Sequence, residues 1–460
     1  MAQEQMSSSK KLEKFGYKQE LHRGLELSDV VLYGVLFMVI IAPQSIFGEI
    51  QLASGGMTPL VYIVGFLAIS FTALSYVRMS RRFPIAGSVY SYVQRGLNPH
   101  VGFIAGWLIL MDYVFSPALL YIMVANWGTT LVPGSPWYVW ILAFAAFNTF
   151  ANVRGFRMTR TVDWVIFTVE IIALIAFIAL GTKFILGGGG TGAFVLDPIY
   201  QEGKVDAHFI ASAASIACLS FLGFDGISTL AEETHKPEVT IGRSILIALC
   251  IIIVCFVSQT YIAALIQPDW QNTDAAMGFF DSVRLAGGDL FMKFMLVVNI
   301  VAVGIANTMN VQTAASRLLY SMGRDKVIPS IFGKVHPKFQ TPWISAIFLG
   351  ILSLSLPLFL GMTDLVRLVN FGALASFIML NFATFYFFFF VEKEAWNFVN
   401  IIKYLICPWI GIAILVFVFT GFEPMTYVVG VVWLILGLII GFVKSKGYKE
   451  VPEAFKNLEV

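Results

Sequence analysis

Charged residues are scarce in this sequence. They make up 13% of its 460 residues, whereas a typical soluble domain contains about 25%. Hydrophobic residues reach 58%, and the mean hydropathy is +0.80. This balance excludes an ordinary soluble domain and indicates a protein that crosses a membrane many times. The net charge is only +2, so we expect no strongly acidic partner such as a nucleic acid.

Cysteine and histidine are also few. The four cysteines lie in or beside apolar stretches and show no metal-ligand spacing, so we expect small core residues. The five histidines fall at the ends of apolar segments or between them, and none is placed for a buried proton relay. We find no pairing of a nucleophile with a base and no metal cluster, so the sequence does not predict an enzyme or a bound cofactor.

Long hydrophobic segments, in contrast, are abundant. A helix needs about 20 mostly apolar residues to cross a bilayer. Twelve segments qualify: residues 28–52, 58–78, 99–130, 135–153, 161–186, 208–231, 241–266, 290–316, 342–361, 364–391, 401–421 and 424–444. The polar N-terminal stretch leads into these segments without the features of a cleaved signal peptide. We therefore predict an all-α membrane protein with twelve transmembrane helices.

Lysine and arginine predict the orientation of these helices, because they concentrate on the cytoplasmic side. With the N-terminus inside, only five of the 30 basic residues fall outside: Lys183, Lys204, Arg284, Lys293 and Arg367. Both termini are therefore predicted to be cytoplasmic, with the protein in the cell's inner (plasma) membrane.

Two segments carry interruptions at corresponding places. The first contains Pro43, which removes a backbone donor and clashes with the preceding turn. The sixth contains Gly223 and Gly226 on either side of Asp225. If halves of five helices repeat with inverted topology, these segments correspond, and paired breaks point to a midplane binding site in a secondary transporter. A proline kink and a glycine packing face would explain the same residues without a site.

Acidic residues inside the apolar segments are the strongest chemical signal. Asp112, Glu170 and Asp225 lie in such segments, whereas no lysine or arginine falls in the middle of one. A carboxylate in the bilayer is costly and commonly marks a transport path or a proton relay. Acids without an opposing base favour a cationic substrate, protons, or both.

Several motifs resemble those of a known family. They are FPIAGSVYSY (83–92) with NPHVGF (98–103), SFLGFDGISTLAEET (220–234), SRLLYSMGRD (316–325), GKVHPKFQTP (333–342) and LVNFGALASF (368–377). Together they resemble the amino acid–polyamine–organocation (APC) superfamily and are especially similar to its bacterial putrescine importers. The resemblance runs from about residue 21 to the eleventh segment.

The resemblance implies a LeuT-type core of two inverted five-helix repeats plus two peripheral helices. Residues 1–23 would form a cytoplasmic tail, 24–391 the ten-helix core, 392–444 the peripheral helices and 445–460 a second cytoplasmic tail. The substrate would lie between the broken first and sixth helices and the third, eighth and tenth. In putrescine importers an acid follows the phenylalanine of the first break. Here Gly48 follows Phe47 and Glu49 comes one residue later, a rotation of about 100° on a helix.

Nine residues are the candidates for the site. They are Gln44, Ser45, Phe47, Asp112, Tyr113, Phe221, Phe224 and Asp225 for the substrate, and Glu170 for proton coupling. The aspartates would bind ammonium groups, with Tyr113 adding aromatic attraction. The polar pair would orient the substrate and the phenylalanines would enclose it. Glu170 would load and release a proton, because burial favours the neutral form of a carboxyl group.

Structural roles for the same acids stay open. Asp225 could cap the second half of its broken helix, and Asp112 and Glu170 could be hydrogen-bonded within the helix bundle. A further charged cluster is expected to form the ion pairs of an inner gate: Glu232, Glu233, Arg317, Arg324 and Asp325.

The sequence thus predicts an importer of a small organic amine, a putrescine-like polyamine or a monoamine, that works by alternating access. A proton, or alternatively sodium, would be the coupling ion, and the expected partners are the cationic amine and the lipid bilayer. An amine is favoured because the first break, with one glycine and a proline, offers few N–H groups to hold a carboxylate. An amino acid permease or exchanger of the same superfamily is the alternative, and a non-transporting amine sensor is a third.

Overall fold

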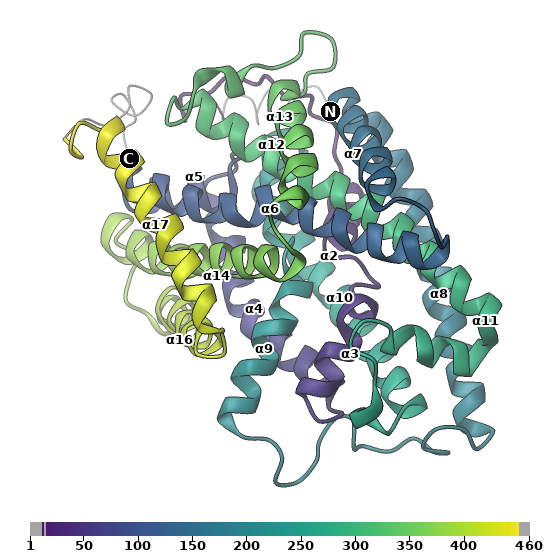
Figure 1. The fold of residues 1–460 in the computed structure, drawn as a ribbon. Helices are drawn as coiled ribbons and strands as arrows, with labels where there is room; N and C mark the ends of the chain where they lie inside the picture. The colour runs from purple at the N-terminus through teal and green to yellow at the C-terminus, as the bar shows by residue number, and fades with distance from the viewer. Residues whose placement is uncertain (1–11, 13–14, 450–460) are drawn as a thin grey trace.

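The computed structural model describes residue 12 and residues 15–449, and the regular structure in this part of the chain is helical. One isolated parallel bridge joins Leu25 to Thr234. Figure 1 shows helices surrounding a centre that α6 (Pro99–Leu131) crosses beside α14 (Met362–Tyr386). The predicted all-helical class is therefore confirmed.

Nine helical stretches in this described part are long and apolar enough to cross a membrane. They are Thr58–Arg82, Pro99–Leu131, Arg160–Leu186, Ala214–Glu233, Pro237–Ile266, Gly278–Arg324, Met362–Val391, Phe398–Phe419 and Pro424–Lys444. Helices α2 (Leu27–Met38) and α3 (Pro43–Ala53), bent by 47° at their junction, make a tenth if they form one span. The two other predicted segments are the helix α7 (Trp137–Arg154) and the shorter apolar stretch Trp343–Leu358. A count of twelve spans and the inverted-repeat layout stay predictions.

The remaining helical elements connect to these spans. Helix α4 (Thr58–Arg82) is followed by the short α5 (Ser88–Gly96), and α8 (Phe156–Leu186) precedes α9 (Ala207–Phe221). Further along come α10 (Pro237–Ile266), α11 (Gly278–Val301), the π-helical turn η3 (Ala302–Asn307) and α12 (Thr308–Arg324). The last elements are α13 (Trp343–Ser355), α16 (Cys407–Phe419) and α17 (Pro424–Lys444).

Both predicted breaks are present and they pack against each other. The first separates α2 from α3, and the second separates α9 from the 3₁₀ segment η1 (Asp225–Glu233). Gly223 sits in the second break at φ +116°, a conformation that side chains disfavour. A Cβ atom there would lie 2.5 Å from Cδ2 of Phe37, at the end of α2. The ring of Phe37 therefore occupies the space that the missing side chain leaves.

Replacing Gly223 with alanine is expected to destabilise this junction. Backbone strain costs about 1–3 kcal/mol, and overpacking against Phe37 adds a similar amount. Gly188→Ala is the matched control, since Gly188 has φ +90° but open space where a Cβ atom would lie. Thermal unfolding of the purified protein should show a clearly lower Tm for Gly223→Ala than for the control. Equal Tm values would show that the two breaks do not depend on this contact.

Candidate functional site

A cavity of about 80 Å³ lies between the two breaks and is also lined by α6, α14 and the η3–α12 region. At about 15 Å³ for each water position, it has room for about five waters, which suits a small ligand. Its polar lining side chains are Ser45, Asp112, Ser116, Ser220 and Asn307. The other lining residues are hydrophobic. Among the described residues that line it, Asp112 alone has an ionisable side chain.

Asp112 lies near the middle of α6 and is 4% exposed. One carboxylate oxygen accepts a hydrogen bond of 2.8 Å from Ser116, one turn further along. Helix α14 comes close here because Gly372 packs on α6: a Cβ at Gly372 would lie 2.4 Å from Cβ of Met111. The sequence therefore places a single buried carboxyl group against the cavity from a tightly packed helix pair.

Asp225, the first residue of η1, is fully buried and does not line this cavity. Its carboxylate accepts hydrogen bonds from the Tyr113 hydroxyl and, at 3.3 Å, from the backbone N–H of Gly223. These contacts tie α6 to the second break. Asp225 and Asp112 are still close enough to interact electrostatically. The two predicted ammonium ligands are thus neighbours, with only Asp112 facing the open space.

Gln44 does not line the cavity and instead ties the first break to α10 and α11. Its side-chain N–H donates to Gln259 of α10 (3.0 Å), and its oxygen accepts from Asn299 of α11 (2.7 Å). Gln259 in turn donates to the carbonyl of Ile40 within the break (2.7 Å). Ser45, by contrast, lines the cavity. Of the two residues predicted to orient the substrate, one faces the cavity and the other anchors the backbone around it.

The three predicted enclosing phenylalanines are fully buried, and none lines the cavity. They pack in aromatic clusters: Phe47 against Phe279, Phe221 against Tyr62 and Phe256, and Phe224 against Tyr76 and Phe377. The aromatic ring at the cavity is Phe37 instead. Glycines in the sixth segment signal that some large side chain approaches, but their positions do not say which one.

Glu170 is completely buried on α8 and lies apart from the cavity lining. Neither of its oxygens makes a hydrogen bond within the described residues. The group is nevertheless near the backbone of Ile40, in the first break. Asp163, seven residues earlier on α8, is also buried and accepts a long hydrogen bond of 3.4 Å from Asn310. The sequence analysis passed over Asp163, although an acid two helical turns before Glu170 was a detectable signal.

Asp163 lines a second, small cavity of about 30 Å³. Ion pairs surround it: Asp29 pairs with Arg160, and Glu233 pairs with Arg317. Unlike the central cavity, this one is lined by charges of both signs: the carboxyl groups of Asp29, Asp163 and Glu233 and the guanidinium groups of Arg160 and Arg317.

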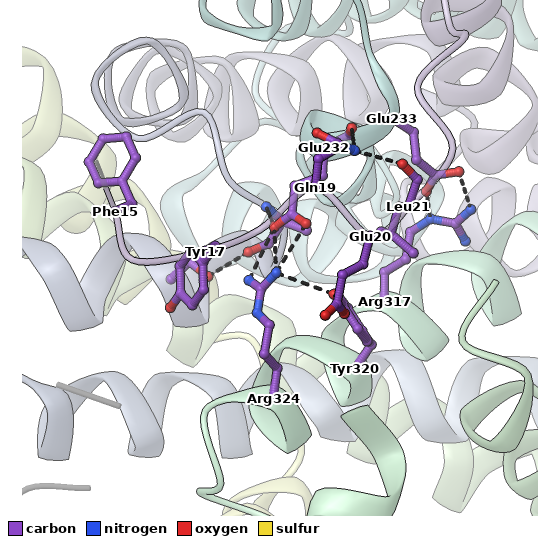
Figure 2. A network of polar contacts seen from close by, with 12 residues as sticks. Phe15, Tyr17, Gln19, Glu20, Leu21, Glu232, Glu233, Arg317, Tyr320 and Arg324 are labelled. Atoms are coloured by element: carbon purple, nitrogen blue, oxygen red, sulfur yellow. Dashed lines mark hydrogen bonds and ion pairs between the residues drawn. The ribbon is translucent and has the colours of Figure 1, made fainter. Parts of the chain in front are cut away.

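Two of the predicted ion pairs at the far end of η1 are present, as Figure 2 shows. Asp325, the fifth predicted member, accepts hydrogen bonds from Tyr17 and Tyr90. We use the name gate cluster for Glu232, Glu233, Arg317, Arg324 and Asp325. Arg317 pairs with Glu233, and Arg324 pairs with Glu232 at 3.0 Å. Glu232 and Glu233 are the last residues of η1, which begins at the second break. This one short segment therefore connects the cluster to the wall of the central cavity.

The N-terminal segment, residues 15–25, lies across the gate cluster (Figure 2). Tyr17 donates to Asp325 (3.0 Å), and Gln19 donates to the carbonyl of Glu232 (2.9 Å). Burial raises the pKa of Tyr17 to about 12, so its hydroxyl stays protonated at neutral pH and remains a donor. The sequence analysis missed this contact because a polar, lysine-rich tail carries no local signal of docking.

A larger cavity of about 340 Å³, which we name the vestibule, adjoins the central cavity. The two share four lining residues, Ile46, Leu119, Met123 and Leu219, which we name the neck. None of the gate cluster lines the vestibule. The described structure therefore has a central cavity that shares an apolar boundary, the neck, with the vestibule. A packed cluster of ion pairs lies at the end of η1 away from the second break.

A family model described as amino acid permease matches residues 30–452. The chain belongs to this amino acid permease family. The chain is 32% identical over 444 residues to the low-affinity putrescine importer PlaP of Escherichia coli K12, covering 94% of this chain and 96% of that protein. It is 23% identical to the branched-chain amino acid permease BcaP of Bacillus subtilis (95% and 96% covered). It is 26% identical to the methylthioribose transporter of the same organism (79% and 81% covered).

The predicted membership of the APC superfamily is thus confirmed, and the protein is a multi-pass membrane protein of a transporter family. Its relatives' names cover a diamine, branched-chain amino acids and a thiosugar. Family membership alone therefore leaves the substrate open, and the chemistry of the central cavity must distinguish these classes.

Proposed function

We propose that the permease is a secondary active transporter that imports a small organic amine, such as a putrescine-like diamine or a monoamine, with proton coupling and alternating access. The observation that carries this proposal is the central cavity itself: a single carboxyl group, Asp112, in a small and otherwise uncharged space. One ammonium group would pair with Asp112 while the hydrocarbon part of the amine lies against the apolar wall.

The backbone of the first break favours an amine over an amino acid. A bound amino acid would need donors for its carboxylate. Pro43 has no N–H, and those of Ala42, Gln44 and Ser45 already donate to carbonyls within the break (2.9, 3.0 and 3.1 Å). The described lining also contains no lysine, arginine or histidine. A carboxylate would therefore find only neutral hydroxyl and amide donors there, beside the negative charge of Asp112, which makes the loss of its hydration costly.

The predicted site residues that do not line the cavity would act in a later step of the transport cycle. Asp225 would bind a second ammonium group only after the Tyr113 hydroxyl releases it. Phe47, Phe221 and Phe224 would reach the substrate only if the half-helices that carry them rotate. In the proposed cycle, α2–α3 and α9–η1 rock together, the gate cluster opens toward the cytoplasm, and both termini stay on that side.

Uptake by the purified protein in proteoliposomes tests the proposed function. We expect radiolabelled putrescine to accumulate in the vesicles under an inward proton gradient, with the outside acidic. Other aliphatic amines should compete with it. Leucine should neither accumulate nor compete. Because the chain is also similar to the branched-chain amino acid permease BcaP, transport of an amino acid is the second candidate function. Accumulation of leucine without any accumulation of amine would establish that alternative, and binding of amines without accumulation would indicate a sensor.

Glu170→Gln is expected to uncouple the permease from the pH gradient. An amide cannot release a proton, so gradient-driven accumulation of amine should fall by about 100-fold or more, the lower end of what proton-transfer groups contribute. Exchange of internal for external amine needs no net proton movement and should persist. Replacing sodium with potassium should change neither activity. Gradient-driven accumulation that survives in Glu170→Gln would remove Glu170 from the coupling mechanism.

A further inference from the structure

The vestibule carries polar groups whose chemistry the proposed function does not use. Glu49, Arg367, Asn370 and Glu423 line it together with threonine, serine and apolar side chains. Its volume of about 340 Å³ falls within the usual range for small-molecule sites, roughly 300–1,000 Å³. The space is thus large enough to hold a ligand of its own.

Arg367 does not make this space cationic. Its guanidinium pairs with Glu423 (2.5 Å) and with Asp364 (3.1 Å). The positive charge of Arg367 and the negative charge of Glu423 therefore cancel within the lining. Glu49 is left as the unbalanced charge, and it forms no hydrogen bond or ion pair within residues 15–449. The vestibule lining accordingly has a net negative charge.

Glu49 is placed in line with the central cavity. It follows Ser45 by four residues on α3, so the two side chains share one face about 6 Å apart along the axis. Ser45 lines the central cavity and Glu49 lines the vestibule. Ile46 of the neck lies between them in the sequence and lines both spaces. A cation at Glu49 would therefore be one helical turn from the central site.

Asn370 supplies an independent sign of a missing ligand. It lies on α14, is 6% exposed, and lines the vestibule, yet its side-chain oxygen Oδ1 has no hydrogen-bond partner within the described residues. Buried polar atoms in native structures are nearly always satisfied. An ammonium group is a donor that could satisfy this acceptor.

We propose that the vestibule is a second binding site for an aliphatic amine, with Glu49 as the charged ligand and Asn370 as a neutral acceptor. This inference rests on the proposed amine transport. The amine would pause at Glu49, then pass the neck, whose four apolar side chains exclude water, and pair with Asp112. A diamine should bind here more tightly than a monoamine, because its two positive charges raise its local concentration in a negatively charged cleft.

Two variants of Glu49 separate this site from the central one. Glu49→Gln removes the charge and should raise the KM for putrescine about fivefold at unchanged kcat, as expected for a partly exposed ion pair. The salt dependence of kcat/KM should weaken as well. Glu49→Asp keeps the charge and should restore most of the affinity. Glu202→Gln, an exposed acid that lines neither cavity, is the matched control.

Equilibrium binding of radiolabelled putrescine to the full-length protein in nanodiscs gives a readout that transport alone does not. We expect two sites for each chain in the unmodified protein, the weaker one lost in Glu49→Gln. Asp112→Asn should remove the other site and keep the one at Glu49. A single site, with binding and KM alike in Glu49→Gln and Glu202→Gln, overturns this inference and leaves amine transport standing. A protein that neither binds nor accumulates amines overturns both.

Discussion

Asp112→Asn is expected to abolish amine uptake. The substitution keeps the size of the side chain but removes the one ionisable group in the described lining of the central cavity. Leaving a buried charge without its partner costs about 3–5 kcal/mol, and here the unpaired charge would be the ammonium of the substrate. Since each 1.4 kcal/mol is a factor of about ten, kcat/KM should fall at least about 100-fold. Initial rates of putrescine uptake into proteoliposomes measure this.

Two further variants define what the loss means. Ser116→Ala removes only the hydrogen bond to the carboxylate of Asp112 and should cost about 1 kcal/mol, a severalfold effect. Asp225→Asn disturbs the bond from Tyr113 and tests the second acid. If putrescine uptake survived the double change Asp112→Asn and Asp225→Asn in a protein of unchanged Tm, no ammonium would bind at these carboxylates.

The backbone features of the site could be predicted because their causes are local. Pro43 has no backbone N–H to donate. Gly223 adopts a φ of +116°, which glycine tolerates and other residues disfavour. These properties belong to the residues themselves, so both helix breaks were visible in the sequence. The family motifs added the superfamily, which the comparisons confirm over residues 30–452.

The direction of each side chain could not be predicted in the same way. Successive residues on a helix point about 100° apart, and neighbouring helices decide which direction is the cavity. Asp112 faces the open space, whereas the adjacent Tyr113 turns to Asp225. Phe37 replaces the three predicted phenylalanines at the cavity because of where α2 meets the second break. These outcomes depend on packing between segments far apart in the chain.

The gate cluster joins η1, α12 and the N-terminal segment to one another. Arg317 and Glu233 are 8% and 6% exposed, so their ion pair is shielded from solvent on both sides. The Tyr320 hydroxyl donates to Glu20 of the N-terminal segment (2.9 Å). Separating η1 from α12 would therefore break the ion pairs and the N-terminal contacts together. In the proposed cycle, opening at this end would thus involve the N-terminal segment.

Arg317→Met is expected to destabilise the packing of η1 against α12 strongly. It leaves Glu233 buried without its partner, a cost of about 3–5 kcal/mol. The double variant Arg317→Met, Glu233→Met removes both charges and should recover most of the loss, because an apolar pair needs no compensation. Thermal unfolding measures the stability, and hydrogen exchange at residues 15–25 should speed up in the single variant and return toward normal in the double. If both variants unfolded at the temperature of the unmodified protein, the ion pair would not be what holds η1 against α12.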